Sequence, residues 1–220
     1  MYIKEPFLKR PFDIVLSIIG LIISFPLWII IAIAIYLEDR GPIFFSLQLP
    51  GRYDKPFRWL KFRTMKYSKG EKHEMIFLEN DPRVTKVGRI LRAMSMDELP
   101  QLINILRGDM SFVGPRPIDR SEGNPKYKDV SEIPGYEIRR QLRPGLTGIA
   151  QVYADKYISP KNKFRYDVLY AKKMSFLLDL KLILISFLVS LKLGWEKKGR
   201  KIKRIKIKKY LRWLKVKRIR

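Results

Sequence analysis

The sequence contains no cysteine, which excludes a disulfide framework and catalysis by a thiol. Histidine is nearly absent as well: His73 is the only one, so neither a histidine metal site nor a histidine general base is expected. The chain also has no internal repeats and no glycine pattern of the Walker or Rossmann kind. These absences argue against thiol or histidine chemistry and against the common nucleotide-binding loops.

Acidic residues are scarce: 21 Asp and Glu stand against 46 Lys and Arg, and the formal net charge is +25. A charge of this size implies an anionic partner, either a phosphate-rich small molecule, an anionic lipid or a nucleic acid. The length of 220 residues favours one domain, or one domain with appendages.

Charge is missing altogether from residues 14–37, an apolar run of 24 residues. The run is too long for the core of a secretory signal and no cleavage site follows it, so membrane insertion is expected. Pro26 lies near its middle, where proline removes a backbone hydrogen bond and kinks a helix. Each arm then reaches about half of a hydrocarbon core of roughly 30 Å. Ser24 is expected to donate its hydroxyl to a carbonyl freed by this break.

The charges around this run bear on how it enters the membrane. Lys4, Lys9 and Arg10 precede it, the chain after it is also strongly basic, and positive residues prefer the cytoplasmic side. A simple transmembrane span would place one basic end on the disfavoured side, whereas a re-entrant hairpin keeps both ends in the cytoplasm. From the residues alone, the two arrangements are about equally favoured.

A second apolar segment, residues 175–193, is interrupted by Asp179, Lys181 and Lys192. Its uncharged run, residues 182–191, is too short to span a bilayer. The segment is therefore either a core helix or a helix that lies on the membrane surface.

Residues 196–220 form a basic tail with 14 Lys and Arg and a single acid. Apolar side chains recur on one face of a helix at Ile207, Tyr210, Leu211 and Leu214. A basic amphipathic helix of this kind most often docks on anionic lipid, with nucleic acid as the competing ligand. A membrane-attached adaptor that binds lipid or nucleic acid through this tail is the rival to an enzyme.

The middle of the chain predicts an α+β fold that is mainly helical. Residues 43–49 and 57–64 flank a turn-like stretch and predict a β-hairpin. The apolar spacing in residues 84–94 and 101–106 predicts two helices. Two prolines flank Arg116, so residues 108–117 are expected to form a rigid loop that presents its guanidinium, and residues 143–148 form a second such loop.

The acidic pair Asp97 and Glu98 has two readings. Ser95 and Glu98 have the spacing of a helix capping box. Pro100 argues against the box, because it would be the fifth residue of that helix, where its missing N–H is needed. The helix is therefore expected to begin at or after Asp97, which puts both carboxylates at a helix N-terminus, where a phosphate also binds favourably.

A carboxylate beside a bound phosphate has two chemical uses. It can hold Mg²⁺, which takes one or two carboxylates together with substrate phosphates. It can also attack phosphorus and form an acyl phosphate. An anion that attacks an anion needs its charge offset, and Arg92, Arg116 and Arg143 are the candidates.

Four blocks of sequence carry a resemblance to a known family: NDPRVTKVGRILRAMSMDELPQLINILRGDMSFVGPRP at 80–117, KFRTM at 61–65, RPGLTGIAQV at 143–152 and SFLLDLKLI at 175–183. Together they resemble the bacterial monotopic phosphoglycosyl transferases, also called bacterial sugar transferases, over about residues 9–193. The resemblance implies an enzyme, here a minimal catalytic unit, that transfers a phosphosugar from a nucleoside-diphosphate sugar, usually a UDP-sugar, to polyprenyl (undecaprenyl) phosphate. UMP is released, and downstream glycosyltransferases extend the product into a membrane-assembled glycan.

The resemblance also implies roles for individual residues. Asp97 would be the nucleophile that forms a covalent phosphosugar intermediate and a ligand of Mg²⁺, with Glu98 assisting either the acceptor phosphate or the metal. The residues expected to bind substrate are Lys61, Arg63, Arg92, Pro115, Arg116, Pro117 and Arg143. Two positions depart from the family pattern: Phe25 precedes Pro26 where members often have serine, and Ile149 stands where tryptophan is usual.

The family inserts its N-terminal helix as a re-entrant hairpin, which favours that arrangement for residues 1–40. The implied organisation continues with a catalytic domain and its interfacial helices at residues 41–195, followed by the basic tail at 196–220. Such a protein lies in the bacterial inner (cytoplasmic) membrane, with its catalytic domain on the cytoplasmic face and in contact with anionic headgroups. Nucleic acid is then not an expected partner.

Overall fold

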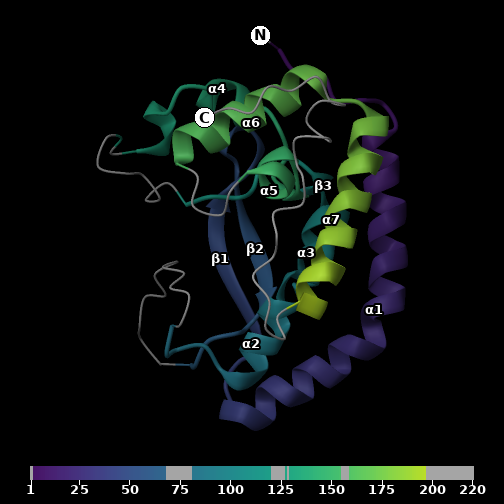
Figure 1. Ribbon diagram of the computed structural model, residues 1–220, viewed down its shortest axis with the longest axis vertical. Helices are drawn as coiled ribbons and strands as arrows, with labels where there is room; N and C mark the ends of the chain where they lie inside the picture. The colour runs from purple at the N-terminus through teal and green to yellow at the C-terminus, as the bar shows by residue number, and fades with distance from the viewer. Residues whose placement is uncertain (1, 68–80, 120–126, 128, 155–158, 197–220) are drawn as a thin grey trace.

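The computed structural model describes residues 2–67, 81–119, 127, 129–154 and 159–196, in which a long helix borders a small mixed domain (Figure 1). The predicted fold class, α+β and mainly helical, is confirmed. The basic tail lies outside the described residues apart from Glu196.

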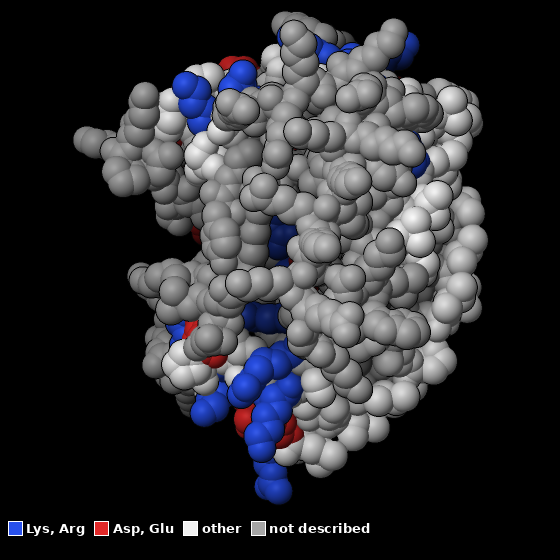
Figure 2. All heavy atoms as spheres, viewed as in Figure 1, with Lys and Arg blue, Asp and Glu red and all other residues white. Residues whose placement is uncertain are grey.

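α1 (Lys9–Asp39) contains the uncharged run, and among the described residues it is the one helix long and apolar enough to cross a membrane. Pro26 lies in its interior, and Figure 1 shows α1 as two arms that meet at a marked bend. Exposed apolar side chains lie along both arms, among them Val15, Ile18, Ile22, Ile23, Ile29, Ile30 and Ile33. Figure 2 shows the edge formed by α1 as white, whereas Lys and Arg gather near α2. The path of α1 through a bilayer stays a prediction.

The predicted partner of Ser24 is wrong in detail. In a regular helix, the amide that Pro26 lacks would bond the carbonyl of Ile22. The Ser24 hydroxyl instead donates to the carbonyl of Gly20 at 2.6 Å, as serine commonly does one turn back along a helix. The indole N–H of Trp28 donates to Ser24 Oγ at 3.0 Å, so these two side chains link the turns on either side of Pro26.

The predicted hairpin is confirmed as β1 (Phe44–Pro50) and β2 (Pro56–Phe62), which pair in antiparallel register. Trp28 packs on two rings at the open end of this hairpin. Its ring centroid lies 6.0 Å from that of Phe44 and 5.2 Å from that of Phe62. The second arm of α1 is therefore held against the hairpin by aromatic contacts.

Each of the two predicted rigid loops contains a short strand, which the sequence did not indicate. β3 (Ser111–Val113) and β4 (Gly145–Thr147) pair in parallel. Just beyond β3, the Gly145 N–H donates to the Pro115 carbonyl at 2.8 Å. A Cβ on Gly145 would lie 2.1 Å from the Gly114 nitrogen, so only glycine permits this close approach. The two loops are thus parts of one small sheet.

The helices predicted at 84–94 and 101–106 are confirmed with small shifts in their ends, and Gly108 ends the second of them with a φ of 93°. In chain order, the remaining elements are η1 (Arg52–Asp54), α2 (Lys86–Ala93), η2 (Met96–Glu98), α3 (Gln101–Arg107), η3 (Val130–Glu132), α4 (Tyr136–Arg139), α5 (Ile149–Tyr153), α6 (Pro160–Lys173) and α7 (Phe176–Glu196).

The main core lies between the hairpin, α3, β3 and the last three helices. Trp59, Ile105 and Leu182 are among its buried members. α7 therefore contributes one face to the core, while Leu184 and Phe187 on its other face are exposed. Its predicted role as a core helix holds in part, and contact of its exposed face with a membrane stays a prediction.

Candidate active site

The acidic pair lies in η2, a single 3-10 turn between α2 and α3. Ser95 precedes it with a left-handed backbone, φ 56°, and makes no side-chain capping bond, so the capping box is excluded. Pro100 is the N-cap of α3, which begins at Gln101. Pro100 therefore delays the helix as predicted. The expectation that both acids sit at the helix N-terminus is corrected, because they occupy a separate turn before it.

Lys61, on β2, bridges the two acids. Its Nζ lies 2.8 Å from Glu98 Oε1 and 3.3 Å from Asp97 Oδ2. The same ammonium lies 4.5 Å from the centroid of the Trp59 ring and so makes a cation–π contact with it. Lys61 and Asp97 are both buried, so their charges compensate each other where solvent screens them little.

Arg116 reaches the pair from the loop after β3. Its Nη2 lies 3.4 Å from Glu98 Oε1, the oxygen that Lys61 also contacts, and 43% of its side chain is exposed. Burial raises the pKa of Glu98, but Lys61 and Arg116 outweigh burial and lower this pKa to about 2. Glu98 is therefore ionised at neutral pH and is a weak base.

Arg92, on α2, interacts with the other acid. Its Nε donates to Thr64 Oγ1 at 2.9 Å. Burial lowers the pKa of Arg92 and outweighs the attraction to Asp97 and Asp81, which raises it, so the charges of Arg92 and Asp97 influence each other. Gly88 packs on the main chain of Thr64 and sets the place of α2. The structure thus brings Lys61 and Arg116 into contact with the acidic pair and puts Arg92 near Asp97, whereas the role of all three as substrate ligands stays a prediction.

The close contact at Gly88 gives a testable prediction. A Cβ there would lie 2.1 Å from the Thr64 carbonyl oxygen. Gly88→Ala should therefore lower the free energy of unfolding by about 1–3 kcal/mol through overpacking. Thermal unfolding in detergent measures this. Arg89→Ala, at an exposed position of the same helix, is the control and should change stability by less than about 0.5 kcal/mol. Equal melting of Gly88→Ala and the unaltered protein would contradict the packing argument.

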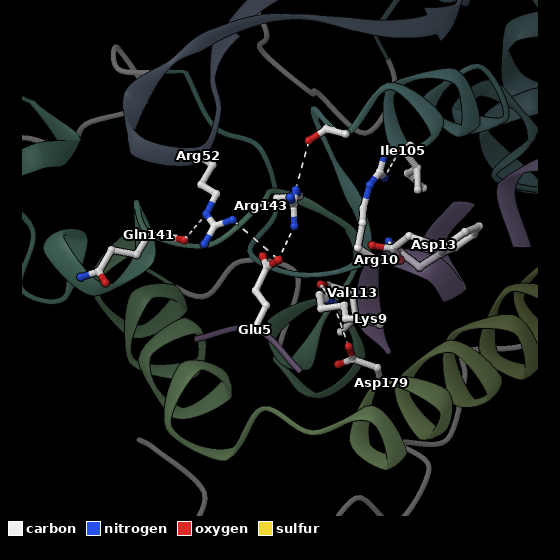
Figure 3. Close-up of polar contacts among 12 residues, drawn as sticks. Glu5, Lys9, Arg10, Asp13, Arg52, Ile105, Val113, Gln141, Arg143 and Asp179 are labelled. Carbon is white, nitrogen blue, oxygen red and sulfur yellow. Dashed lines mark hydrogen bonds and ion pairs between the residues drawn. The ribbon is translucent and has the colours of Figure 1, made fainter. Parts of the chain in front are cut away.

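Two predicted substrate-binding arginines are engaged elsewhere. Arg63 is buried and forms a two-pronged ion pair with Asp39 at the end of α1. Arg143 pairs with Glu5 and donates to the Gly108 carbonyl at 3.2 Å (Figure 3). Glu5 and Asp39, which lie before α1 and at its end, form ion pairs with these guanidinium groups. Both arginines therefore connect the N-terminal region to the rest of the domain. Their predicted role as substrate ligands stays a prediction.

A buried polar cluster anchors the start of α1. Lys9 Nζ donates to Asp179 Oδ2 at 2.7 Å, to the Val113 carbonyl at 2.8 Å and to the Tyr170 hydroxyl at 3.1 Å. Figure 3 shows Lys9 between Val113 and Asp179. One ammonium therefore joins α1 to β3, α6 and α7, close to the loop that carries Arg116.

Two polar residues that support the site were missed in the sequence. Asn104, buried in α3, donates to the Arg58 carbonyl at 2.7 Å and accepts from the Leu60 N–H at 3.1 Å, which fixes this part of β2. Its position inside an apolar helical stretch was the available signal. Arg139, buried in α4, donates to the Arg116 carbonyl, and no local pattern marks it.

Whether a metal ion fits this site depends on the side chains that could bind it. Among the described residues, no three acidic or histidine side chains form a metal-binding group. Two carboxylates still suit Mg²⁺, because this ion takes its other ligands from substrate phosphates and water. Of the four carboxylate oxygens of the pair, Lys61 and Arg116 contact Asp97 Oδ2 and Glu98 Oε1, and no hydrogen-bond donor among the described residues reaches the other two. Asp97 and Glu98 are the residues that would hold the ion.

Comparison with known proteins identifies the family. Residues 4–193 match the family model for bacterial sugar transferases. The chain is 39% identical over 183 residues to a UDP-glucose:undecaprenyl-phosphate glucose-1-phosphate transferase of Klebsiella pneumoniae, which covers 81% of this chain and 39% of that protein. It is 38% identical over 183 residues to a UDP-N-acetylgalactosamine-undecaprenyl-phosphate N-acetylgalactosaminephosphotransferase of Aeromonas hydrophila, with 80% and 42% covered.

A third relative is the exopolysaccharide production protein ExoY of Sinorhizobium fredii, 36% identical over 190 residues, with 80% of this chain and 81% of that protein covered. The chain thus spans about two fifths of the length of the first two relatives and most of the third. The family match runs from before α1 into α7 and includes the acidic pair with its surrounding cations. The chain belongs to the bacterial sugar transferase family.

Proposed function

We propose that this protein transfers a sugar-1-phosphate from a UDP-sugar to undecaprenyl phosphate, or to another polyprenyl phosphate, at a membrane surface. The proposal rests on one observation: the buried carboxylate of Asp97 lies beside Glu98 and Lys61 in a chain of this family. The names of the relatives, which specify UDP-glucose and UDP-N-acetylgalactosamine as donors, support the substrate class.

The proposed reaction consists of two displacements at one phosphorus. A carboxylate oxygen of Asp97 attacks the phosphorus that carries the sugar, an aspartyl–phosphate bond forms, and UMP leaves with the bridging oxygen. An oxygen of the polyprenyl phosphate then attacks the same phosphorus. This second step forms the polyprenyl-diphosphate sugar and returns Asp97 as a free carboxylate.

Attack by an anion on an anion needs positive charge at the site. Lys61 and Arg116 contact the acidic pair, and the charge of Arg92 interacts with that of Asp97, which supports the proposal that these three cations offset the charge of the donor phosphates. Mg²⁺, when bound, would supply further charge that offsets the phosphates. With a pKa of about 2, Glu98 is better suited to hold these cations than to accept a proton.

We propose the re-entrant arrangement for α1, with both ends on the cytoplasmic face of the bacterial inner membrane. Lys9 at one end pairs with Asp179, and Asp39 at the other end pairs with Arg63. A straight helix of 31 residues would reach about 46 Å and separate these ends across a bilayer. Because one domain holds both ends, the bend at Pro26 supports entry and exit on one side.

The basic tail gives a prediction about lipid binding. Deletion of residues 196–220 should lower the preference of the protein for anionic over neutral vesicles by about 10-fold or more, because each Lys or Arg near such a surface contributes about 1 kcal/mol. Co-sedimentation with vesicles of the two compositions measures the preference. Binding to neutral vesicles is the control and should change little, since α1 is retained. An unchanged preference would contradict docking through the tail.

Lys61 gives a prediction about pH. The pKa of Glu98 is lowered to about 2 from its ordinary 4.5, so the stability this group contributes is complete above about pH 4.5 and is lost as the pH falls toward 2. Lys61→Met removes one of the cations that lower this pKa. The variant should therefore lose less stability than the unaltered protein between about pH 5 and pH 3, as measured by urea unfolding.

Glu98→Gln is the control for this comparison, because it removes the titration of Glu98 in either background. The difference in acid sensitivity between Lys61→Met and the unaltered protein should vanish when Glu98→Gln is added to both. A difference that persists would assign the effect to another acid.

A panel of UDP-sugars tests the proposed function. The protein is incubated with undecaprenyl phosphate, Mg²⁺ and one donor at a time, including UDP-glucose and UDP-N-acetylgalactosamine, and UMP release is measured. With the acceptor omitted, intact-mass measurement should detect a phosphosugar adduct on the protein. Absence of UMP release with every donor would overturn the proposal.

A further inference from the structure

We propose that Arg139 is a positioning residue, which holds the main chain at Arg116 so that the Arg116 guanidinium points at the acidic pair. The inference deepens the proposed function and rests on it, because it requires Arg116 to act on the donor phosphates. Asp167 and Phe164 hold Arg139 in turn. These three residues come from α4 and α6, outside the turn that carries the acids.

The planar guanidinium of Arg139 has two terminal nitrogens, and each of them contacts a different group. One terminal nitrogen, Nη2, donates to the carbonyl oxygen of Arg116, and the other, Nη1, pairs with Asp167 Oδ2. The guanidinium carbon lies 4.7 Å from the centroid of the Phe164 ring. Arg139 and Asp167 are both buried, so this fork is held by three groups with little solvent to compete.

The main chain around Arg116 has few other ways to be held. Pro115 and Pro117 have no N–H to donate, so the loop lacks one main-chain hydrogen-bond donor on each side of Arg116. On the side of β3, the Pro115 carbonyl accepts from the Gly145 N–H. On the other side, the hydrogen bond from Arg139 to the Arg116 carbonyl fixes the main chain in the same way.

The direction in which the Arg116 side chain points depends on the position of its main chain. The side chain is 43% exposed and contacts the pair at 3.4 Å through Glu98 alone. A shift of about 1 Å in the main chain would therefore move the guanidinium off the phosphates, and a misplacement of this size can lower the rate about 100-fold.

A purely structural role is the competing explanation, because α4 and α6 also pack through Tyr136 and Phe164, and loss of a buried ion pair lowers stability in any case. The two explanations differ in whether the effect of replacing Arg139 on activity depends on Arg116. If Arg139 acts through Arg116, its replacement should matter only while the Arg116 guanidinium is present.

The test is a double-mutant cycle of Arg139→Lys and Arg116→Ala, with kcat and KM measured for the active UDP-sugar. Lysine keeps the charge beside Asp167 but cannot donate in a fork to two acceptors. We expect Arg139→Lys alone to lower kcat/KM by about 10- to 100-fold, and by less than about 2-fold when Arg116→Ala is also present. An equal fold-loss in both backgrounds would overturn the inference.

Arg140→Lys is the matched control, because the neighbouring Arg140 pairs with Asp54 and Glu137 and should tolerate the change. Should Arg139→Lys fail to fold, Asp167→Glu makes the same test, since a longer carboxylate displaces Arg139 from the Arg116 carbonyl and keeps the charge pair. Inactivity of the unaltered protein with every donor, or full activity of Arg116→Ala, would instead count against the proposed function.

Discussion

Asp97→Asn is expected to lower UMP release by about 1,000-fold or more, because an amide has no anionic oxygen to form the aspartyl–phosphate bond. The replacement has nearly the same shape, and only 10% of the Asp97 side chain is exposed, so the fold should tolerate it. Lys61 also keeps its shorter contact, 2.8 Å to Glu98. The variant should still fractionate with membranes and show no phosphosugar adduct by intact mass.

Asp109→Asn is the matched control, because it makes the same chemical change at an acid outside the pair. Its carboxylate contacts Asn104 at 3.4 Å, so UMP release should stay within about 2-fold of the unaltered protein. Glu98→Gln should fall between the two, since it leaves the nucleophile intact but removes the charge that Lys61 and Arg116 contact. Unaltered UMP release in Asp97→Asn would refute the covalent mechanism.

The acidic pair and its cations could be predicted from the sequence because short-range constraints mark them. Pro100 excludes the capping box, and two prolines isolate Arg116 in a loop. The resemblance of the surrounding blocks then points to Lys61 and Arg92. In the structure, Lys61 and Arg116 contact the pair, and Arg92 lies near enough to Asp97 for their charges to interact.

Other parts of the site could not be predicted, because their partners are remote along the chain. Arg63 and Arg143 have the same residue type as Arg116, yet Asp39 and Glu5 hold them, at separations of 24 and 138 residues. The pairing of β3 with β4 is equally remote and has only three residues a side. Nothing in the residue types distinguishes an arginine that is free to meet substrate from one that a distant carboxylate already holds.

Lys9→Met should have the largest effect on stability, and lower the free energy of unfolding by about 3–5 kcal/mol. Without Lys9, the buried Asp179 carboxylate would keep one side-chain hydrogen-bond donor among the described residues, the Tyr170 hydroxyl at 2.7 Å. The substitution would also leave the Val113 carbonyl without the Lys9 donor. For a chain of this length the melting temperature should fall by about 10 °C or more, measured by thermal unfolding in detergent.

The double variant Lys9→Met with Asp179→Leu separates the cost of an unpaired charge from the value of the pair. Because both buried charges are then replaced by apolar groups, it should recover part of the stability that Lys9→Met loses. Lys4→Met, at an exposed position of the same segment, should melt with the unaltered protein. A Lys9→Met protein that melts within about 2 °C of the unaltered protein would show that α1 is held mainly by its apolar contacts. The result expected here instead makes one buried ammonium the anchor that keeps the start of α1 beside the loop carrying Arg116.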